Sequence, residues 1–305
     1  DLHSFPTRRS SDLHIAQVAK RARREHYPAP YAVIDLWVRH GASGPQAYEA
    51  EARSIAELFL SPTARNLVRV FFLQDRLKTL GGKGARDVKH VHVVGAGVMG
   101  GDIAAWCALR GFDVTLQDRS MDLVAPALKR AEELFAKRQR DPQKAQAARA
   151  RLAADVEGAA VPKADFVIEA IFESLDAKRE LYAKLEPRMK PEAILATNTS
   201  SIMLEPLAQP LARPARLVGL HFFNPVPQMP LVEIVRGRDT DPAVAQAALG
   251  FARRLDKLPV PCRSAPGFIV NRVLMPYLNE AMFAAQDGVP MPLIDRAAEI
   301  GRAHV

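Results

Sequence analysis

The first part of the chain, residues 14–85, has apolar residues at helical spacing. In "SIAELFLSPTARNLVRVFFLQDRLKTLGG", Ile55, Leu58 and Phe59 recur three or four residues apart, which predicts amphipathic helices. Ser61-Pro62 predicts a new helix start, because a capping residue followed by proline suits a first turn. Gly81-Gly82 predicts the end of that helix. This stretch shows no candidate chemistry, and its apolar faces need something to pack against.

After Lys83 short apolar runs alternate with helical stretches. The predicted strands are "VHVVGAG", "FDVTLQD", "DFVIEAIF", "AILATN", "RLVGLHFF" and "PLVEIV". The helical stretches are "VMGGDIAAWCALRG", two charged segments split by Asp141-Pro142, and "AKRELYAKLEPRM". This alternation predicts the α/β class, with βαβ units and a parallel sheet. Past Pro266 the pattern is helical again, and Pro276 should kink that helix.

Composition sets only broad limits on function. The 305 residues are 48% hydrophobic and 25% charged, which is typical of globular proteins with one large domain or two modest ones. The net charge is +8, of which residues 1–90 contribute +6. A basic excess favours anionic partners such as a phosphate-bearing ligand, although a solvated surface with extra arginines explains it equally well. With 7% aromatic residues and no recognisable motif, nucleic-acid binding is disfavoured.

The cysteines and the chain ends narrow the setting. Cys107 and Cys262 are the two cysteines, and neither lies in a CxxC or Cys/His cluster. We therefore expect no metal site and no disulfide framework, and a reducing cytoplasm fits. No apolar run reaches the roughly 18 residues of a membrane span, and no signal-peptide core is present. Residues 1–13 and 299–305 resemble translated sequencing adapter, so we interpret them as non-native; a native disordered tail is the alternative.

The stretch "VVGAGVMG" has the G-x-G-x-x-G spacing of a dinucleotide-binding turn. Gly95 would allow the tight turn, Gly97 the approach of a pyrophosphate, and Gly100 close packing of helix and strand. The N–H groups of the helix's first turn would face the phosphates. Asp118 lies eighteen residues after Gly100, at the end of the next predicted strand. An acid at this position binds ribose hydroxyls and repels a 2′-phosphate. This predicts NAD rather than NADP, although Arg119 weakens the preference; a tight turn beside a surface aspartate is the alternative.

Residues 219–233, "GLHFFNPVPQMPLVE", are almost wholly apolar yet contain His221 and Glu233. A buried structural histidine is the ordinary explanation. However, the preceding strand "AILATNTSSI" ends in small polar residues, and ligands bind at the carboxyl ends of parallel strands. Glu233 lies in the next strand-like run, close enough in sequence to fold back onto the imidazole, whose tautomer and basicity a carboxylate would set. Asn271 is likewise polar amid apolar neighbours in the helix after "PGF".

Residues 86 to about 298 resemble the 3-hydroxyacyl-CoA dehydrogenase family. The resemblance rests on "GAGVMG", "VIEAIFESLDAK", "ATNTSSI", "GLHFFNPVPQMPLVEIVRG" and "PGFIVNRVLMPYLNEA", in that order. Residues 14–85 resemble the segment that joins the hydratase and dehydrogenase halves of multifunctional fatty-acid oxidation proteins. The resemblance therefore implies a helical linker at 14–85, a Rossmann-type NAD-binding domain at 86–265, and the start of a truncated all-α domain at 266–298.

The resemblance also implies residue roles. His221 would be the catalytic base, Glu233 its carboxylate partner, and Ser200 and Asn271 the groups that hold the substrate oxygen. The cofactor or cleft would be lined by Gly95, Gly97, Met99, Gly100, Asp118, Ile171, Phe172, Glu173, Lys178, Ser200 and Asn224. Three of these have ordinary alternatives: Lys178 as a solvated helix lysine, Glu173 as a helix N-terminal acid, and Asn224-Pro225 as a turn.

The function implied is NAD-dependent oxidation of an L-3-hydroxyacyl-CoA to a 3-ketoacyl-CoA in fatty-acid β-oxidation. For the intact protein the resemblance implies a homodimer or a thiolase-containing complex. Three alternatives stay open: a non-catalytic dinucleotide-binding relative, an inactive fragment of the bifunctional enzyme, and a 6-phosphogluconate-type dehydrogenase, whose catalytic lysine is not marked here. One departure is Asp102, where the family more often has a small residue. That acid would either oppose the pyrophosphate or complement the helix N-terminus.

Overall fold

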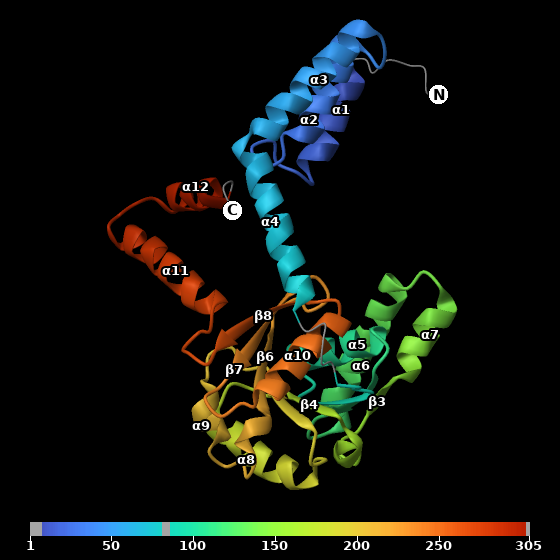
Figure 1. Cartoon of the computed structure of the whole chain (residues 1–305), viewed down its shortest axis with the longest axis vertical. Coiled ribbons are helices and arrows are strands. Elements are labelled where there is room, and N and C mark those ends of the chain that lie inside the picture. Colours follow the sequence, from blue (N-terminus) through green and yellow to red (C-terminus); the bar gives the residue numbers. More distant parts are fainter. Residues whose placement is uncertain (1–7, 81–85, 303–305) are drawn as a thin grey trace. The chain divides into compact units, whose positions relative to one another are not determined.

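The computed structural model describes residues 8–80 and 86–302 (Figure 1), and the chain divides into two compact units. One unit combines the residues up to Asp75 with those from Leu278 onward, and the other runs from Arg76 to Tyr277. The predicted helix end at Gly81-Gly82 lies outside the described residues, as do residues 1–7 and 303–305 of the predicted non-native ends.

The N-terminal stretch is helical, as predicted. Its helices are α1 (Arg8–Ala19), α2 (Ala29–His40), α3 (Pro45–Leu60) and α4 (Pro62–Thr79). The predicted restart at Ser61-Pro62 is confirmed: α4 begins at Pro62, and the Ser61 hydroxyl oxygen accepts a hydrogen bond from the Ala64 N–H at 3.1 Å. This side chain caps the first turn of the helix.

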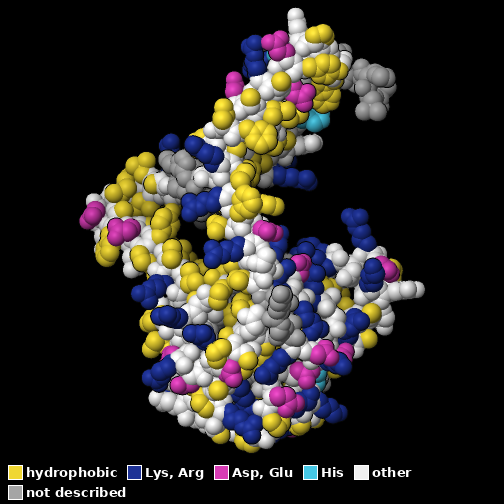
Figure 2. Space-filling model, viewed as in Figure 1, with side chains coloured by type: hydrophobic (Ala, Val, Ile, Leu, Met, Phe, Trp, Pro, Cys, Tyr) yellow, Lys and Arg dark blue, Asp and Glu magenta, His cyan; other side chains and the backbone are white. Residues whose placement is uncertain are grey.

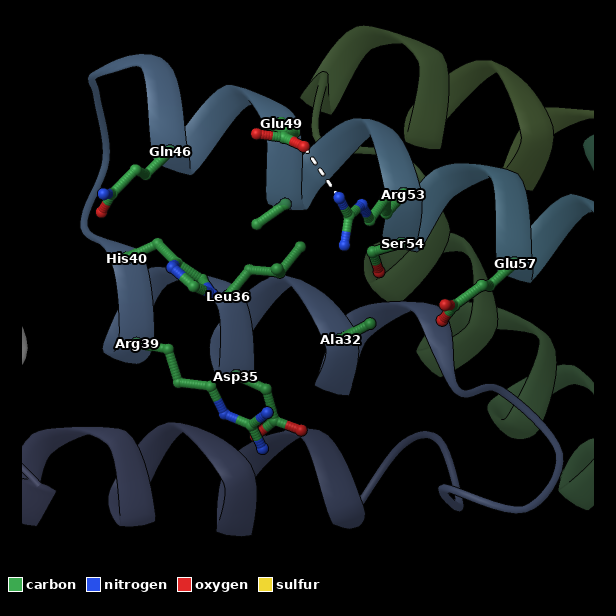
Figure 3. Close-up of a pocket in the computed structure, with 11 residues that line it drawn as sticks. Ala32, Asp35, Leu36, Arg39, His40, Gln46, Glu49, Arg53, Ser54 and Glu57 are labelled. Atoms are coloured by element: carbon green, nitrogen blue, oxygen red, sulfur yellow. Dashed lines mark hydrogen bonds and ion pairs between the residues drawn. The ribbon is translucent and has the colours of Figure 1, made fainter.

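These helices bury little apolar surface. No described residue of α3 or α4 is buried, and Tyr31 is the one buried residue of α2. Figure 2 shows apolar side chains along this stretch; those of α3 and α4 that are largely exposed include Ile55, Phe59, Leu60, Leu67, Val68, Phe71, Phe72 and Leu73. Between α2 and α3 lies a polar groove of about 630 Å³ (Figure 3), lined by charged residues such as Asp35, Arg39 and Glu57.

The second unit contains an eight-stranded sheet in the order β3-β2-β1-β4-β5-β6-β7-β8. The strands are β1 (His90–Val94), β2 (Asp113–Gln117), β3 (Leu152–Ala154), β4 (Phe166–Glu169), β5 (Ile194–Thr197), β6 (Leu217–Phe222), β7 (Leu231–Arg236) and β8 (Leu258–Arg263). All neighbours pair in parallel except β6 and β7, which are antiparallel. The predicted parallel sheet is present with one departure: the loop at 223–230 is too short for a crossover helix, so the chain turns directly back and β7 runs antiparallel to β6.

Two strands were not predicted. β3 has three residues, too few to show an alternating pattern. β8, "LPVPCR", contains Pro259 and Pro261, which argue against a central strand. It is an edge strand, hydrogen-bonded to β7 alone, and prolines are tolerated there because one side of the strand needs no donors.

Helices cover both faces of the sheet and give two apolar cores. The core on one face includes residues of α5 (Val98–Leu109), α6 (Met121–Arg138), α7 (Pro142–Ala150) and α10 (Pro242–Arg254). The other includes residues of α8 (Leu175–Leu185) and α9 (Leu204–Ala208), and Val161 from the short 3-10 helix Val161–Lys163. Two further 3-10 helices span Glu186–Arg188 and Pro214–Arg216. The predicted break at Asp141-Pro142 is confirmed, since Asp141 caps α7 by accepting from the Gln143 N–H.

The chain continues into α11 (Val270–Gln286) and α12 (Met291–Arg302). α11 extends through Pro276 as one helix, and no described residue of it is buried. Across the part of the chain that the structure describes, every helix falls short of the length and apolar character needed to cross a membrane.

Candidate active site

The glycine-rich turn joins β1 to α5. Gly95 has φ +106°, and a Cβ there would lie 2.5 Å from the Ala170 carbonyl oxygen. A Cβ on Gly100 would lie 1.8 Å from the Gly95 oxygen. Gly97 differs, because a Cβ there would meet no atom within 4 Å. The protein's own packing thus requires the first and third glycines, whereas the second leaves open space at a helix N-terminus, which fits a bound pyrophosphate.

Asp118 lies beside this turn, as the sequence predicts. Its Oδ2 accepts from the Ala96 N–H and its Oδ1 from the Arg119 N–H, each at 2.7 Å. A carboxylate offers about four acceptor positions, so both oxygens keep capacity for ribose hydroxyls. Met99, in the first turn of α5, packs against the neighbouring apolar core. These positions fit a dinucleotide, and their roles remain predictions.

Asp102 lies in α5 and faces α6. The Arg130 Nε is 3.9 Å from Asp102 Oδ1, and the same guanidinium donates to the Gly97 carbonyl oxygen at 3.2 Å. Burial raises the pKa of Asp102, and Arg130 opposes that rise. The unusual acid is therefore accompanied by a cation from the adjacent helix, which reduces its repulsion toward a nearby phosphate.

His221 and Glu233 face one another across the antiparallel strands β6 and β7. The register pairs them directly, and His221 Nδ1 lies 2.6 Å from Glu233 Oε2. His221 is 5% exposed and Glu233 is fully buried. The predicted contact is confirmed. It forms because directly opposite residues in an antiparallel pair project from the same face of the sheet.

The remaining oxygen of Glu233 is also engaged. Its Oε1 accepts from the N–H groups of Ile269 and Val270 at 2.9 and 2.8 Å, where α11 begins. Burial tends to raise the pKa of Glu233, but the hydrogen bonds from His221 and these two amides outweigh it, so the pKa is lowered. The carboxyl group is therefore an anion at neutral pH, held in place by three donors.

Ser200 and Asn271, the two residues predicted to hold the substrate oxygen, lie in contact. The Asn271 Nδ2 donates to the Ser200 carbonyl oxygen at 3.1 Å. Asn198, two residues earlier, accepts from the Phe222 N–H at 2.9 Å, which ties the end of β5 to the end of β6. The loop after β5 is therefore fixed beside the strand that carries His221.

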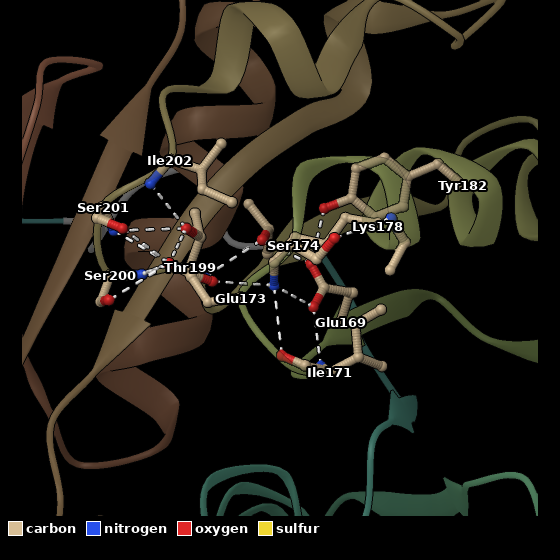
Figure 4. A network of polar contacts seen from close by, with 12 residues as sticks. Glu169, Ile171, Glu173, Ser174, Lys178, Tyr182, Thr199, Ser200, Ser201 and Ile202 are labelled. Atoms are coloured by element: carbon tan, nitrogen blue, oxygen red, sulfur yellow. Dashed lines mark hydrogen bonds and ion pairs between the residues drawn. The ribbon is translucent and has the colours of Figure 1, made fainter.

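Glu173 and Lys178 belong to a polar network at the ends of β4 and β5 (Figure 4). Lys178 is 1% exposed, so the alternative of a solvated lysine is wrong. Glu173 Oε1 accepts from Thr199 Oγ1 at 2.6 Å and from the Ser200 N–H at 2.9 Å. The cap of α8 is instead Ser174, which accepts from the Ala177 N–H. Glu173 therefore contacts the loop after β5.

The roles of the other predicted lining positions remain predictions. Ile171 donates its N–H to Glu169 Oε1 at 2.9 Å, and Phe172 is exposed. Asn224 is exposed, and its peptide bond to Pro225 is cis, in the turn between β6 and β7. Within the described residues, no group of three or more His, Cys, Asp or Glu side chains could hold a metal ion.

Sequence reasoning missed the centre of the polar network. Glu169 is fully buried, and Tyr182, Thr197 and Lys178 all donate to its carboxylate. A signal was available, since "VIEA" places an acid at the end of an otherwise apolar predicted strand. A buried acid requires partners, which points to nearby donors.

Comparison with known proteins shows which family the chain belongs to. Residues 90–265 match the family model of the 3-hydroxyacyl-CoA dehydrogenase NAD binding domain, and residues 267–303 match that of the C-terminal domain. The chain belongs to the 3-hydroxyacyl-CoA dehydrogenase family. The predicted α/β class, Rossmann-type domain and NAD as cofactor are thereby confirmed.

Individual proteins similar to this chain carry names of the same family or of a fatty acid oxidation complex. The chain is 34% identical over 282 residues to a fatty acid oxidation complex subunit alpha of Pseudomonas entomophila, covering 90% of this chain and 39% of that protein. Solved 3-hydroxybutyryl-CoA dehydrogenases of Escherichia coli and Ralstonia eutropha are 37% and 35% identical, with TM-scores of 0.65 and 0.63. Each covers 67% of this chain, and the chain covers 44% and 74% of them respectively. The chain thus spans about two fifths of its curated relative.

Proposed function

We propose that this chain carries the NAD-dependent dehydrogenase step of fatty-acid β-oxidation, in which an L-3-hydroxyacyl-CoA is oxidised to a 3-ketoacyl-CoA. The observation that carries the proposal is the buried His221–Glu233 contact at 2.6 Å, on strands of a family NAD-binding domain. A histidine oriented by a carboxylate is the arrangement that a general base requires.

His221 would take the proton of the 3-hydroxyl group. With Nδ1–H donated to Glu233, the neutral ring keeps its lone pair on Nε2, so Nε2 is the atom that accepts the proton. The ring then becomes an imidazolium, and the Glu233 anion stabilises that charge. Phe223 and Phe268 lie beside the ring, with centroids 4.5 and 5.8 Å away. Their apolar surfaces limit water around the pair, which strengthens this electrostatic stabilisation.

Ser200 and Asn271 would orient the substrate oxygen. Their mutual hydrogen bond fixes the Asn271 amide beside the loop after β5. A substrate oxygen held by such groups stays aligned with the base, and alignment of this kind lowers the entropic part of the barrier.

The residues around Gly97 and Asp118 would hold the dinucleotide. The open space at Gly97 and the N-terminus of α5 fit the pyrophosphate, and Asp118 fits the ribose hydroxyls. When bound, NAD supplies the acceptor for the hydride released from C3. Six further residues would line the cofactor or the cleft: Met99, Ile171, Phe172, Glu173, Lys178 and Asn224.

The domain division and the wider setting are further parts of the proposal. The family models meet between residues 265 and 267, which supports a boundary there between the NAD-binding and helical domains. Residues 14–85 would be the linker of a longer protein. A homodimer or thiolase-containing complex in the cytoplasm would suit that longer protein, because its curated relative is a subunit of a fatty acid oxidation complex.

The test is NADH oxidation by the full chain with acetoacetyl-CoA, followed by absorbance, alongside a fluorescence titration with NADH. We expect both binding and turnover. NADH binding without turnover would instead identify a non-catalytic relative or an inactive fragment. The absence of NADH binding would contradict the cofactor assignment itself.

A further inference from the structure

Glu169 is a buried carboxylate that the reaction proposed above does not use. It ends β4, and each of its oxygens accepts two hydrogen bonds. Oε1 accepts from the Ile171 N–H at 2.9 Å and from Lys178 Nζ at 2.6 Å. Oε2 accepts from the hydroxyls of Tyr182 and Thr197 at 2.8 and 2.7 Å. All four acceptor positions of the carboxylate are therefore filled.

These donors come from three separate segments. Lys178 and Tyr182 lie one turn apart on α8, Thr197 ends β5, and Ile171 lies in the loop after β4. The sheet register places Thr197 directly beside Glu169. One carboxylate thus joins the two strand ends and the helix that surround the loops at 170–174 and 198–202 (Figure 4).

Lys178 connects this buried carboxylate to a second one. Its ammonium lies 2.6 Å from Glu169 Oε1 and 3.3 Å from Glu173 Oε2. Lys178 is almost fully buried, so water cannot replace a lost partner. The position of the ammonium is therefore set by the balance between the two anions.

Glu173 carries the connection to the loop after β5. Its Oε1 accepts from Thr199 Oγ1 at 2.6 Å, from the Ser200 N–H at 2.9 Å and from the Ser201 N–H at 3.2 Å. Asn271 contacts the same loop through the Ser200 carbonyl oxygen. Ser200 is thus held between Glu173 and Asn271.

We propose that Glu169 is a positioning residue: it fixes the Lys178 ammonium, which fixes Glu173, which holds Ser200 in its place beside Asn271. This rests on the proposed function, because Ser200 and Asn271 are the groups assigned to the substrate oxygen. Without the Glu169 charge, Lys178 has Glu173 as its single anionic partner. The ammonium then moves toward Glu173, and the Glu173 oxygens turn away from Thr199 and Ser200.

Glu169→Gln isolates the charge in this chain of contacts. The amide oxygen can still accept from Ile171 and Lys178, and the amide NH₂ can donate to the hydroxyls of Tyr182 and Thr197, which also accept hydrogen bonds. The number of hydrogen bonds is preserved while the anion is lost. Shape and packing change little, so the variant tests position rather than folding.

Glu186→Gln is a matched control. Glu186 is also buried, and it accepts from the N–H groups of Ala212 and Arg213 and pairs with Arg216 at 3.0 Å. None of these partners is among the predicted site residues. We expect both variants to lose unfolding stability to a similar extent in urea titrations.

The kinetic expectation separates the two variants. With acetoacetyl-CoA and NADH, Glu169→Gln should lower kcat by about 10- to 100-fold with a smaller change in KM, since a misplaced group slows the reacting complex. Glu186→Gln should leave kcat within about twofold of the wild type, as expected for a change away from the site. Adding Ser200→Ala to Glu169→Gln should cost far less than Ser200→Ala costs alone, because both changes remove the same alignment.

A binding measurement separates this proposal from the reaction itself. Glu173 and Lys178 are assigned to the cofactor, so Glu169→Gln should weaken NADH binding by about 3- to 10-fold, whereas Glu186→Gln should not. If the wild-type chain binds NADH without turnover, the proposed dehydrogenase reaction is refuted. The NADH affinities of Glu169→Gln and Glu186→Gln would still decide the role of Glu169. Wild-type affinity and turnover in Glu169→Gln, or equal losses in Glu186→Gln, would overturn the proposal. A wild-type chain that does not bind NADH would overturn both.

Discussion

In the sheet unit, strands β1, β4 and β6 bury their apolar side chains on both faces, whereas α3 and α4 carry Phe59, Leu60, Phe71 and Phe72 at 60% exposure or more. Both regions are rich in apolar residues. In the sheet unit, helices from the same unit supply the opposing surface. Along α3 and α4, no opposing surface among the described residues buries these four side chains.

The same contrast holds for polar groups. The sheet unit encloses Glu169, Lys178, Glu233 and His92 at exposures of 1% or less, each with partners at hydrogen-bond distance. Two ion pairs of the N-terminal stretch, Arg24–Asp35 and Arg53–Glu49, are partly to largely exposed. Exposed pairs contribute little to stability or chemistry, because water screens them. The groups to which we assign the chemistry therefore lie in the unit that excludes water.

The largest expected effect is on catalysis in the sheet unit. His221→Ala removes the proposed base, so acetoacetyl-CoA reduction should fall by about 10³-fold or more, near the upper range for general acid–base catalysis. NADH affinity, measured by fluorescence titration, should stay within about threefold, since the ring is assigned to substrate rather than cofactor. His40→Ala on α2 is the control and should leave both quantities unchanged. Parallel loss of binding and turnover in His221→Ala would make the histidine structural.

Glu233→Gln should have the next largest effect, roughly a 10²-fold lower rate, because a preorganised anion beside a developing cation is lost. A glutamine also has one oxygen for three donors, so either His221 or the amides of Ile269 and Val270 lose an acceptor. A rate in Glu233→Gln within about twofold of the wild-type rate would remove Glu233 from the mechanism.

A matched pair of leucine truncations tests the contrast in packing directly. Leu116 in β2 is 1% exposed, and Leu60 at the end of α3 is 80% exposed. Leu116→Ala should lower the free energy of unfolding by about 2–5 kcal/mol through lost burial and a cavity. Leu60→Ala should change it by about 0.5 kcal/mol or less. Urea titrations of the full chain measure both, and similar losses at the two positions would contradict the exposed state of Leu60.

Much of this arrangement was predictable from local pattern. The glycine spacing, the strand before it and Asp118 placed the dinucleotide turn, because each feature is specified within about twenty residues. The contact between His221 and Glu233 was also predictable, since a short loop between two apolar runs brings their residues together. Such inferences succeed where sequence neighbours become spatial neighbours.

Other features depend on contacts distant in sequence. Lys178 lies in "AKRELYAKL", which resembles a solvated amphipathic helix, and its burial follows only from where β4 and β5 end. β8 was missed because its prolines argue against a strand unless its edge position is known. The same applies to Glu169, whose four donors come from three segments. Sequence pattern identifies the residue types, and the topology decides which of them meet.

The smallest expected effect concerns the buried histidines of the sheet unit. His92 is fully buried, with Nδ1 2.8 Å from Thr115 Oγ1 and Nε2 2.9 Å from Gln117 Oε1. Burial lowers the pKa of His92 from 6.5, more than the hydrogen bond to Gln117 raises it. Below pH 6.5, His92 therefore binds a proton more readily in the unfolded chain than in the folded chain. The contribution of His92 to the free energy of unfolding should be fully present above pH 6.5. It should decline as the pH falls toward the lowered pKa of His92.

Glutamine at this position removes the titration while keeping one donor and one acceptor. Between pH 7 and pH 5.5 the wild type should lose stability with a slope below about 1.4 kcal/mol per pH unit for this proton, measured by urea midpoints. His92→Gln should show a shallower slope than the wild type. His90 also has its pKa lowered by burial, so part of the slope should persist in His92→Gln. Identical slopes in the wild type and His92→Gln would mean that His92 takes up its proton equally in the folded and unfolded chain. Burial would then not set the titration of this polar group in the sheet unit.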